Sequence, residues 1–288
     1  MKGPVLVVGA SGNVGAATVR ALVERGIGVR CGVTDPTRFA AVAGAETVEL
    51  DLFRPDTFGP AVDGSRGLFL LRPPPVSKVG PTVNALTEVA VAAGVEHFVF
   101  SSVAGADTNR VVPHHRVETH LREHAPSWTI LRPGFFAQNL TDAYRRDIVQ
   151  DDRIYLPAGS GRVAFVDTRD IGDAAGVVFA DPDRHRGKGY TLTGPRAVTF
   201  DEVAQILSDT LGRTISYQPA AVLGYARHLR QQRAPWVRVL VQTVLHTGLR
   251  SGKAETVDPA LPSLLERPAR TLEDYIRQNA ATWERTPS

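Results

Sequence analysis

Three glycines near the start of the chain have the spacing of a phosphate-binding turn. Gly9, Gly12 and Gly15 lie in the sequence Gly-Ala-Ser-Gly-Asn-Val-Gly, between an apolar run over residues 5–8 and an amphipathic stretch over residues 16–23. In such a unit the first glycine forms the turn, the second lets the backbone approach a phosphate, and the third lets the helix pack on the strand. Free N–H groups at the helix start attract an anion. The pattern predicts binding of a dinucleotide diphosphate; the alternative is a tight turn without a ligand.

The residues that follow the second apolar run, 28–33, indicate which dinucleotide is bound. A carboxylate about twenty residues after the glycines can bond the ribose 2′-hydroxyl, whereas a nearby arginine suits a 2′-phosphate. Asp35 stands there beside Thr34. Arg38 follows, and Arg30 is a second candidate for phosphate contact. We expect NADPH as the cofactor, with NADH possible; the alternative for Arg38 is an exposed charge at a helix start.

A Tyr-x-x-x-Lys pair, the usual proton-exchange device of carbonyl reduction, is missing from this chain. In such a pair the lysine lowers the pKa of the tyrosine phenol, so that the phenol can exchange a proton with a carbonyl. The chain has six tyrosines, and none is followed by a lysine four residues later. Reduction of an isolated ketone by that route is therefore not expected.

The segment that would carry such a pair contains two other candidate groups. Residues 113–118 read Pro-His-His-Arg-Val-Glu, so that His114 and Glu118 lie one helical turn apart on a shared face. A histidine titrates near neutrality and can donate a proton, which makes His114 a candidate catalytic residue. The alternative is that the two form a polar pair at the edge of a pocket. Water is the other candidate proton source.

Aromatic residues in the second half of the chain suggest a pocket for a flat acceptor. Hydride transfer to a quinone, a conjugated enone or a flavin needs less protein acid than ketone reduction, because the cofactor carries the chemistry and the protein supplies orientation. Gln138 is a further candidate for orienting a carbonyl oxygen, the alternative being backbone capping. For the aromatic candidates the alternative is ordinary core packing. The candidate pocket residues are Phe135, Phe136, Asn139, Tyr144, Tyr225 and Trp236.

Strands and helices alternate over the first 150 residues. Continuous apolar strands joined by helices are typical of a parallel sheet covered on both faces, with ligands at the carboxyl ends of the strands. The fold class expected is therefore α/β, a Rossmann-type doubly wound parallel sheet. Expected strands cover residues 5–8, 28–33, 46–51, 67–71, 95–102 and 128–133, and expected helices cover 38–43, 56–62, 79–93 and 113–124.

The regular alternation of expected strands and helices does not continue beyond residue 150. Two strands are expected over 163–167 and 189–193, and helices over 201–211 with Thr199 as its cap, over 221–249 with a break at Pro235, and over 271–283. We expect residues 1–150 to form the NAD(P)-binding domain, with a return segment near 163–195. Residues 151–288 would form mainly a smaller α/β substrate-binding lobe.

Composition excludes several classes of partner. The chain has 288 residues, of which 43% are hydrophobic, enough for a sizeable core. The one cysteine, Cys31, allows no internal disulfide and no cysteine-rich metal site, so we expect no metal and a reducing, cytoplasmic location. No leader or long apolar run is present, and the arginines are scattered at a net charge of +3. We expect no membrane or nucleic-acid partner, and a monomer or homodimer that binds a planar or aromatic small molecule.

The chain resembles the NmrA-like atypical short-chain dehydrogenases, in particular their quinone-oxidoreductase and azoreductase-like branch. The matching stretches span nearly the whole sequence: residues 9–15, 94–102, 128–140, 163–171, 190–195 and 267–275. The resemblance implies a pyrophosphate site, an adenine border, a ribose and nicotinamide lining, and a nicotinamide end where Ser102 is a second candidate catalytic residue. The alternative for Ser102 is a satisfied hydroxyl at a strand end. The implied residues are Gly9, Ser11, Gly12, Asn13, Val14 and Gly15 for the pyrophosphate, Asp51 and Leu52 for the adenine border, Leu71, Arg72 and Pro73 for the ribose and nicotinamide lining, and Ser101 and Ser102 for the nicotinamide end.

Three functions are compatible with these observations. The first is an NAD(P)H-dependent reductase that transfers hydride to a quinone-like or enone-like small molecule, with a biosynthetic tailoring role open. The second is a non-catalytic NADP(H)-sensing regulatory protein, which the missing tyrosine–lysine pair favours. The third is an isomerase, epimerase or dehydratase that uses the cofactor transiently, which the same missing pair disfavours.

Overall fold

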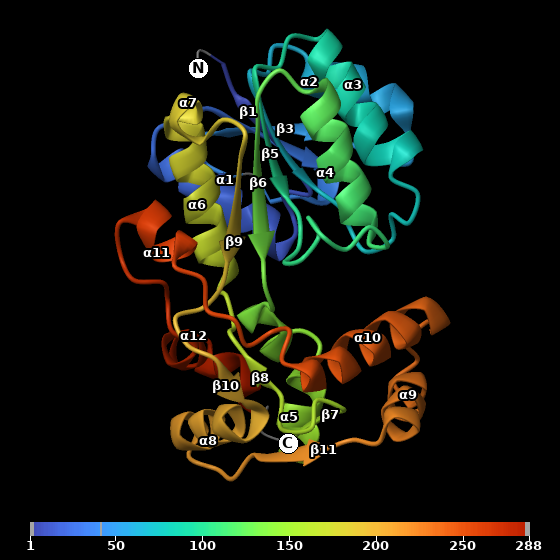
Figure 1. Ribbon diagram of the computed structural model, residues 1–288, viewed down its shortest axis with the longest axis vertical. Helices are drawn as coiled ribbons and strands as arrows, with labels where there is room; N and C mark the ends of the chain where they lie inside the picture. The colour runs from blue at the N-terminus through green and yellow to red at the C-terminus, as the bar shows by residue number, and fades with distance from the viewer. Residues whose placement is uncertain (1–2, 41, 286–288) are drawn as a thin grey trace. The chain divides into compact units, whose positions relative to one another are not determined.

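The computed structural model describes residues 3–40 and 42–285. The chain divides into two compact units, each made of segments far apart in the sequence. Unit 1 consists of Met1–Pro133, Thr168–Leu192 and Pro259–Arg267, and unit 2 consists of Gly134–Asp167, Thr193–Asp258 and Pro268–Ser288. The colour ramp of Figure 1 shows the chain passing from unit 1 to unit 2 and back more than once.

Unit 1 is built on one sheet of seven strands in the order β3-β2-β1-β4-β5-β6-β9. Every neighbouring pair is parallel, which confirms the predicted doubly wound fold class. The inner strands are almost wholly apolar because both faces of the sheet are covered. The strands are β1 (Val5–Val8), β2 (Val29–Val33), β3 (Ala45–Glu49), β4 (Gly67–Leu71), β5 (His97–Ser101), β6 (Trp128–Pro133) and β9 (Lys188–Leu192).

Helices cover the two faces of this sheet, as Figure 1 shows. On one face α1 (Asn13–Glu24) packs closely against α6 (Thr168–Ala180). The absence of a side chain at Gly172 permits this contact, since a Cβ there would come within 2.5 Å of the Ala17 backbone. On the other face lie α2 (Phe58–Val62), α3 (Ala85–Ala92) and α4 (Pro113–His124). Shorter elements complete the unit: η1 (Pro36–Arg38), η2 (Pro55–Thr57), η3 (Gly80–Asn84), α7 (Pro182–His185) and α11 (Ala260–Leu265).

Two sequence predictions for local structure are wrong. No helix covers residues 38–43, of which position 41 lies outside the described residues: η1 ends at Arg38, and a turn at Gly44, with φ +81°, leads into β3. Nor does a strand cover 163–167, because the hydrogen bonds of that segment go to different partners. The Ala164 amide donates to Ala254, whereas Val166 forms a single bridge with Phe136.

Unit 2 contains two small sheets and a helical surround. β7 pairs with β11 in parallel, and β8 pairs with β10 in antiparallel. The helix expected over 201–211 is confirmed as α8, and Thr199 caps it through the amide of Glu202. The strands are β7 (Arg153–Leu156), β8 (Arg162–Val163), β10 (Val198–Thr199) and β11 (Ser216–Pro219). The helices are η4 (Ala137–Leu140), α5 (Arg145–Asp151), α8 (Phe200–Leu211), α9 (Val222–Gln231), α10 (Trp236–Gly248), η5 (Leu249–Ser251), α12 (Leu272–Gln278) and η6 (Ala280–Trp283).

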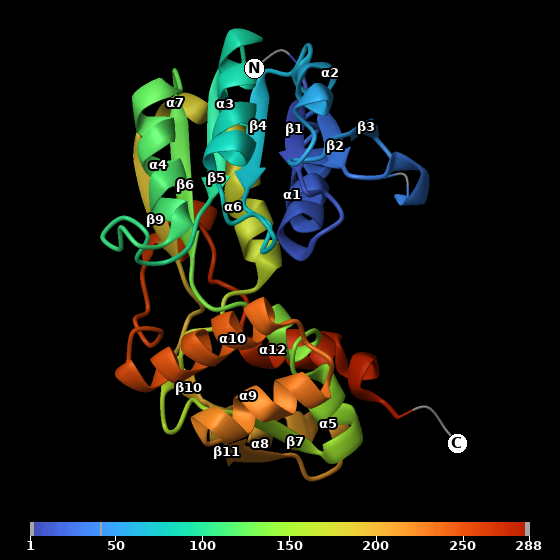
Figure 2. The same cartoon turned by 90° about the vertical axis from the view of Figure 1, so that its right-hand side faces the viewer.

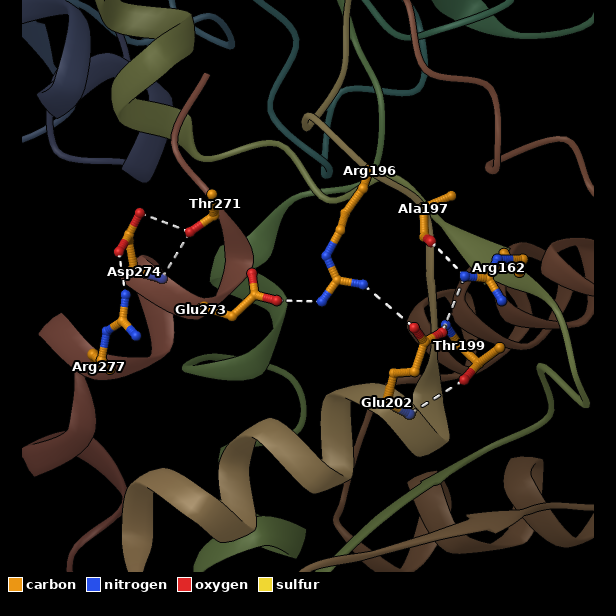
Figure 3. A network of polar contacts seen from close by, with 9 residues as sticks. All are labelled: Arg162, Arg196, Ala197, Thr199, Glu202, Thr271, Glu273, Asp274 and Arg277. Atoms are coloured by element: carbon orange, nitrogen blue, oxygen red, sulfur yellow. Dashed lines mark hydrogen bonds and ion pairs between the residues drawn. The ribbon is translucent and has the colours of Figure 1, made fainter. Parts of the chain in front are cut away.

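A network of ion pairs links the starts of α8 and α12, as Figure 3 shows. Arg196 binds Glu202 on α8 at 3.3 Å and also pairs with Glu273 on α12. Arg162 on β8 reaches the same Glu202 carboxylate at 3.1 Å. Hydrogen bonds from the Thr199 backbone, helped by the two arginines, hold the pKa of Glu202 below its ordinary value. These side chains are partly exposed, so the network fixes geometry more than it stabilises.

Candidate functional site

The glycine turn between β1 and α1 leaves the start of the helix open. Gly9 has φ +64°, a conformation that favours glycine, and its carbonyl accepts from the Gly12 amide at 2.9 Å. Gly12 caps α1 in an extended conformation, and its carbonyl accepts the first helical bond, from Ala16. Ser11, Gly12 and Asn13 are exposed. The start of α1 is therefore exposed at the carboxyl end of the sheet.

The three glycines of the turn serve different purposes. A Cβ on Gly15 would lie 2.1 Å from the Gly9 carbonyl oxygen, so close packing of helix on turn requires glycine there. A Cβ on Gly12 would meet only that same oxygen, at 3.5 Å, so packing does not require this glycine. The first turn of α1 contains no acidic side chain to neutralise the helix dipole. The turn thus fits a diphosphate that approaches the backbone at Gly12.

The predicted 2′-selective residues lie together after β2. Thr34, Asp35 and Arg38 are all exposed. One oxygen of the Asp35 carboxylate accepts from the Thr37 amide at 3.0 Å and from the Thr37 hydroxyl at 2.6 Å, which caps η1. Arg38 forms no ion pair with any residue among 3–40 and 42–285. Arg30, in contrast, is held by Glu46 at 3.0 Å and by backbone carbonyls, so it is not available for a phosphate.

The loop after β3 contains an exposed ring that the sequence reasoning missed. Asp51 orders this loop: its carboxylate accepts from the Phe53 amide at 2.9 Å, and its own amide donates to Thr57. Leu52 is buried, whereas the Phe53 side chain is 64% exposed. A flat apolar surface beside the predicted adenine border is suited to stacking on a base. The signal in the sequence was an aromatic residue directly after Asp51 and Leu52.

Arg72 and His114 contact each other at the carboxyl end of β4. The Nε of Arg72 donates to Nε2 of His114 at 3.3 Å, and its Nη1 donates to the carbonyls of Val76 and Pro73. Burial, and then the neighbouring Arg72 cation, lower the pKa of His114 to about 4. His114 is therefore neutral at pH 7 with Nε2 as an acceptor, and the expectation that it titrates near neutrality does not hold. Leu71 and Pro73 flank the pair and are half-buried.

Ser102 belongs to a buried polar cluster around Glu118. Its hydroxyl donates to Glu118 Oε1 at 2.7 Å, and Glu118 is fully buried. Arg132 binds both carboxylate oxygens, at 3.0 and 2.8 Å, and Arg122 binds one at 2.8 Å. Glu118 thus pairs with arginines and Ser102, which leaves the Ser102 oxygen only as an acceptor. Ser101 lies beside it at the end of β5, also buried.

In unit 2, three of the predicted pocket residues surround a histidine that the sequence reasoning missed. His246 accepts from or donates to Tyr144 at 2.6 Å through Nε2 and Tyr225 at 3.0 Å through Nδ1, with the Phe135 ring 5.9 Å away. Burial lowers the pKa of His246 to about 4 and raises the pKa of both tyrosines. All four side chains are buried, so they form core. The only signal for His246 was a polar residue within an apolar helical stretch.

The remaining pocket candidates lie elsewhere in unit 2. Phe136 is half-buried beside Asn139, whose backbone carbonyl accepts from the Tyr144 amide at 3.0 Å. Gln138 donates to Asp167 at 3.0 Å. Trp236 is 70% exposed, with the Arg230 guanidinium 4.6 Å from its ring centre. The structure therefore brings Phe135, Tyr144 and Tyr225 together and places Trp236 on the surface.

Among residues 3–40 and 42–285, no group of three or more histidine, cysteine or acidic side chains is placed to hold a metal ion. None of the helices in this described part has both the length and the apolar character needed to span a bilayer.

Comparison with known proteins gives one family and a shared fold. Residues 1–233 match the model of the NmrA-like family. An NAD(P)H azoreductase from Xenophilus azovorans is 30% identical over 285 residues, which cover 97% of this chain and 99% of the relative. The Citrobacter sp. triphenylmethane reductase complexed with NADP(H) has a TM-score of 0.85 at 23% identity, covering 95% and 99%. The Escherichia coli NADPH-dependent quinone oxidoreductase with NADPH has a TM-score of 0.84 at 23% identity, again covering 95% and 99%.

Proposed function

Because the chain belongs to the NmrA-like family, we propose that it is an NAD(P)H-dependent reductase that transfers hydride to a quinone-like or enone-like small molecule. The observation that carries this proposal is the open helix start at Gly12, where packing would tolerate a side chain but the residue is glycine. The relatives support it, since their names identify them as reductases of azo, triphenylmethane and quinone compounds.

The residues of unit 1 fit NADPH as the cofactor. The backbone at Ser11, Gly12, Asn13 and Val14 would lie against the diphosphate at the positive end of the helix dipole. Arg38 and Thr34 would contact the 2′-phosphate, because Arg38 has no ion-pair partner among the described residues and Asp35 is engaged as a cap. The adenine side would be Asp51, Leu52 and Phe53, and the nicotinamide side Leu71, Pro73 and Ser101.

Proton handling would depend on solvent rather than on His114. When bound, the reduced nicotinamide supplies a hydride to the acceptor. Neutral His114 accepts a hydrogen bond from Arg72 and thereby orients that guanidinium. We assign Arg72 the stabilisation of negative charge on the acceptor oxygen, with water as the proton source. The hydroxyl of Ser102 donates its hydrogen bond to Glu118. Ser102 would therefore position the cofactor by accepting a hydrogen bond from it, and would transfer no proton.

Acceptor contacts would come mainly from the residues of unit 2, and the residues of unit 1 would hold the cofactor. Phe136 and Asn139 are half-buried and are the candidates for contact with the acceptor, whereas Phe135, Tyr144 and Tyr225 support them from the core and Trp236 lies on the surface. This division assigns selectivity for the acceptor to unit 2.

The test is NADPH consumption across a panel of quinones, azo dyes and enones. We expect turnover that Gly12→Trp abolishes without loss of folded circular dichroism, because the indole would fill the diphosphate position. Gly59→Ala is the matched control, since a Cβ there would meet no atom within 4 Å. His114→Ala is expected to leave kcat independent of pH between 6 and 8. Absence of turnover on every acceptor would contradict the reductase.

A second candidate function is a non-catalytic NADP(H) sensor. The observation that favours it is that the candidate proton donors are engaged: His114 is neutral and Ser102 is bonded to Glu118. A sensor would bind cofactor and distinguish its oxidised and reduced forms while failing to oxidise NADPH with any acceptor. Calorimetric titration with NADP+ and NADPH, beside the turnover panel, separates the two functions.

A further inference from the structure

Helix α10 of unit 2 presents its apolar side to solvent. At about 100° per residue its large apolar side chains fall on one half of the helix. Each of them is between 50% and 76% exposed, whereas Val239 and His246 on the opposite half are buried. We call this surface the α10 face. It consists of Trp236, Val237, Leu240, Val241, Val244 and Leu245.

The inward half of α10 is polar and anchored. His246 bonds the hydroxyls of Tyr144 and Tyr225, which fixes the rotation of the helix. The side-chain oxygens of Gln242 and Thr243 are also turned inward, out of contact with solvent. The helix cannot roll to bury its apolar side without breaking the histidine bonds and exposing the core tyrosines. A contiguous exposed apolar surface of this kind marks an interaction site.

The sequence around the α10 face is basic throughout. No aspartate or glutamate lies between Asp209 and Glu255. α9 packs beside α10, as Figure 2 shows, and four arginines lie along this pair of helices and its connecting loop. Within the part of the chain that the structure describes, Arg227, Arg233 and Arg238 form no ion pair, and Arg230 stacks on Trp236. The cations of the stretch are Arg227, Arg230, Arg233, Arg238, Arg250 and Lys253, together with Arg213, which pairs with Asp152.

We propose that the α10 face docks on the surface of an anionic phospholipid bilayer. An interfacial helix inserts an apolar side into the acyl boundary while basic residues meet the lipid phosphates, and tryptophan is favoured at that depth. A second copy of this chain is disfavoured as the occupant, because it would bring the same unpaired arginines and no carboxylate from this stretch. Such docking needs no spanning helix, so it revises the expectation of no membrane partner without requiring a transmembrane segment.

Vesicle co-sedimentation of the full chain tests this proposal. We expect binding to vesicles of 30% phosphatidylglycerol in phosphatidylcholine, weaker binding to phosphatidylcholine alone, and release as salt rises from about 0.05 to 0.5 M. Leu240→Gln with Val244→Gln should reduce the partition coefficient at least about tenfold, because two apolar side chains no longer insert. Arg238→Gln should reduce it about fivefold.

Matched variants make the result specific. Val111→Gln is the apolar control, since Val111 is 87% exposed in unit 1, and Arg116→Gln is the control for charge. Equal sedimentation of the α10 double variant and the parent would overturn the proposal. A concentration-dependent dimer of the parent that the double variant does not form would also overturn it. So would a higher KM of the double variant for a water-soluble quinone, if the parent does not bind vesicles. These outcomes would assign the α10 face to a second copy or to the acceptor instead.

Discussion

Helices are held in place by different means in the two units. In unit 1, glycines let backbones touch: Gly172 lets α6 lie against α1, and Gly15 lets α1 lie against the turn at Gly9. In unit 2, contacts between buried side chains hold the helices in place. His246 links α10 to the tyrosines of the core, and Asp147 on α5 binds His228 on α9 at 2.8 Å.

The difference has a consequence for what each unit can vary. A contact between backbones specifies one residue type, so Gly15 and Gly172 tolerate almost no substitution, whereas packing does not restrict Gly12. A side-chain cluster can be rebuilt with other side chains of similar volume and polarity. Unit 1 therefore constrains the residue types at its backbone contacts, whereas the core of unit 2 can accept more substitutions.

The largest expected effect separates the stability of the units. Trp283 is fully buried in the unit 2 core, and its indole N–H donates to the Leu140 carbonyl at 3.0 Å. Trp283→Ala should lower the free energy of unfolding by about 4 kcal/mol. Urea titration followed by circular dichroism should show unit 2 unfolding first, with NADPH binding retained by unit 1. Trp236→Ala, at a residue 70% exposed, should cost less than about 0.5 kcal/mol. A single transition that abolishes NADPH binding would contradict independent units.

The next effect contrasts two glycines three residues apart. Gly15→Ala should destabilise unit 1 by about 3 kcal/mol, since its Cβ would lie 2.1 Å from a carbonyl oxygen. Gly12→Ala should leave stability unchanged within about 1 kcal/mol and weaken NADPH binding at least about tenfold. Thermal unfolding and fluorescence titration of NADPH measure the two quantities. Equal loss of stability in both variants would show that Gly12 is also a packing residue, and the diphosphate assignment would lose its main support.

The same contrast explains how much could be predicted from the sequence. The strands of unit 1 carry continuous apolar runs, and β4, α4 and β6 match their predicted bounds. The glycine turn between β1 and α1 was also predictable, because glycine spacing is a local signal. Helix α6 was not assigned, since its glycines and alanines contact α1 rather than forming an apolar stripe.

The site and unit 2 were less predictable because their contacts are long-range. His246 meets Tyr144 across 102 positions of the chain, and no local pattern indicates that contact. His114 was expected to titrate, but its neutrality follows from burial and from Arg72, 42 positions away. Strands β7 and β11 are short and pair across about sixty residues, which removes the periodicity on which sequence analysis depends.

Acid should lower the free energy of unfolding of both units, and that of unit 1 by the larger amount. Burial lowers the pKa of His97, His114 and His246 to about 4, against 6.5 for each in the unfolded chain. Their stabilising contribution is therefore full above pH 6.5 and is lost as pH falls from 6.5 towards 4, because the unfolded chain binds protons first. Each should account for on the order of 3 kcal/mol once the pH has fallen to 4.

Two of these histidines lie in unit 1 and one in unit 2, so acid also separates the units. Urea titrations at pH 7, 5.5 and 4.5 measure the loss, and His246→Gln should flatten the pH dependence of unit 2 alone. A pH-independent midpoint for unit 1 would contradict the neutral state of His97 and His114.

The smallest effect concerns Arg38, where a side chain rather than the backbone would decide selectivity in unit 1. Arg38→Gln should raise the KM for NADPH about tenfold and leave that for NADH unchanged, because only NADPH carries the 2′-phosphate that a guanidinium binds. Arg30→Gln is the matched comparison: Arg30 is held by Glu46, so its loss should alter neither preference. Equal changes for both cofactors in Arg38→Gln would assign the selectivity to Thr34 and Asp35. In that case the choice of cofactor in unit 1 would depend on the conformation of the chain after β2. The contrast between backbone contacts in unit 1 and side-chain contacts in unit 2 would then also apply to cofactor selectivity.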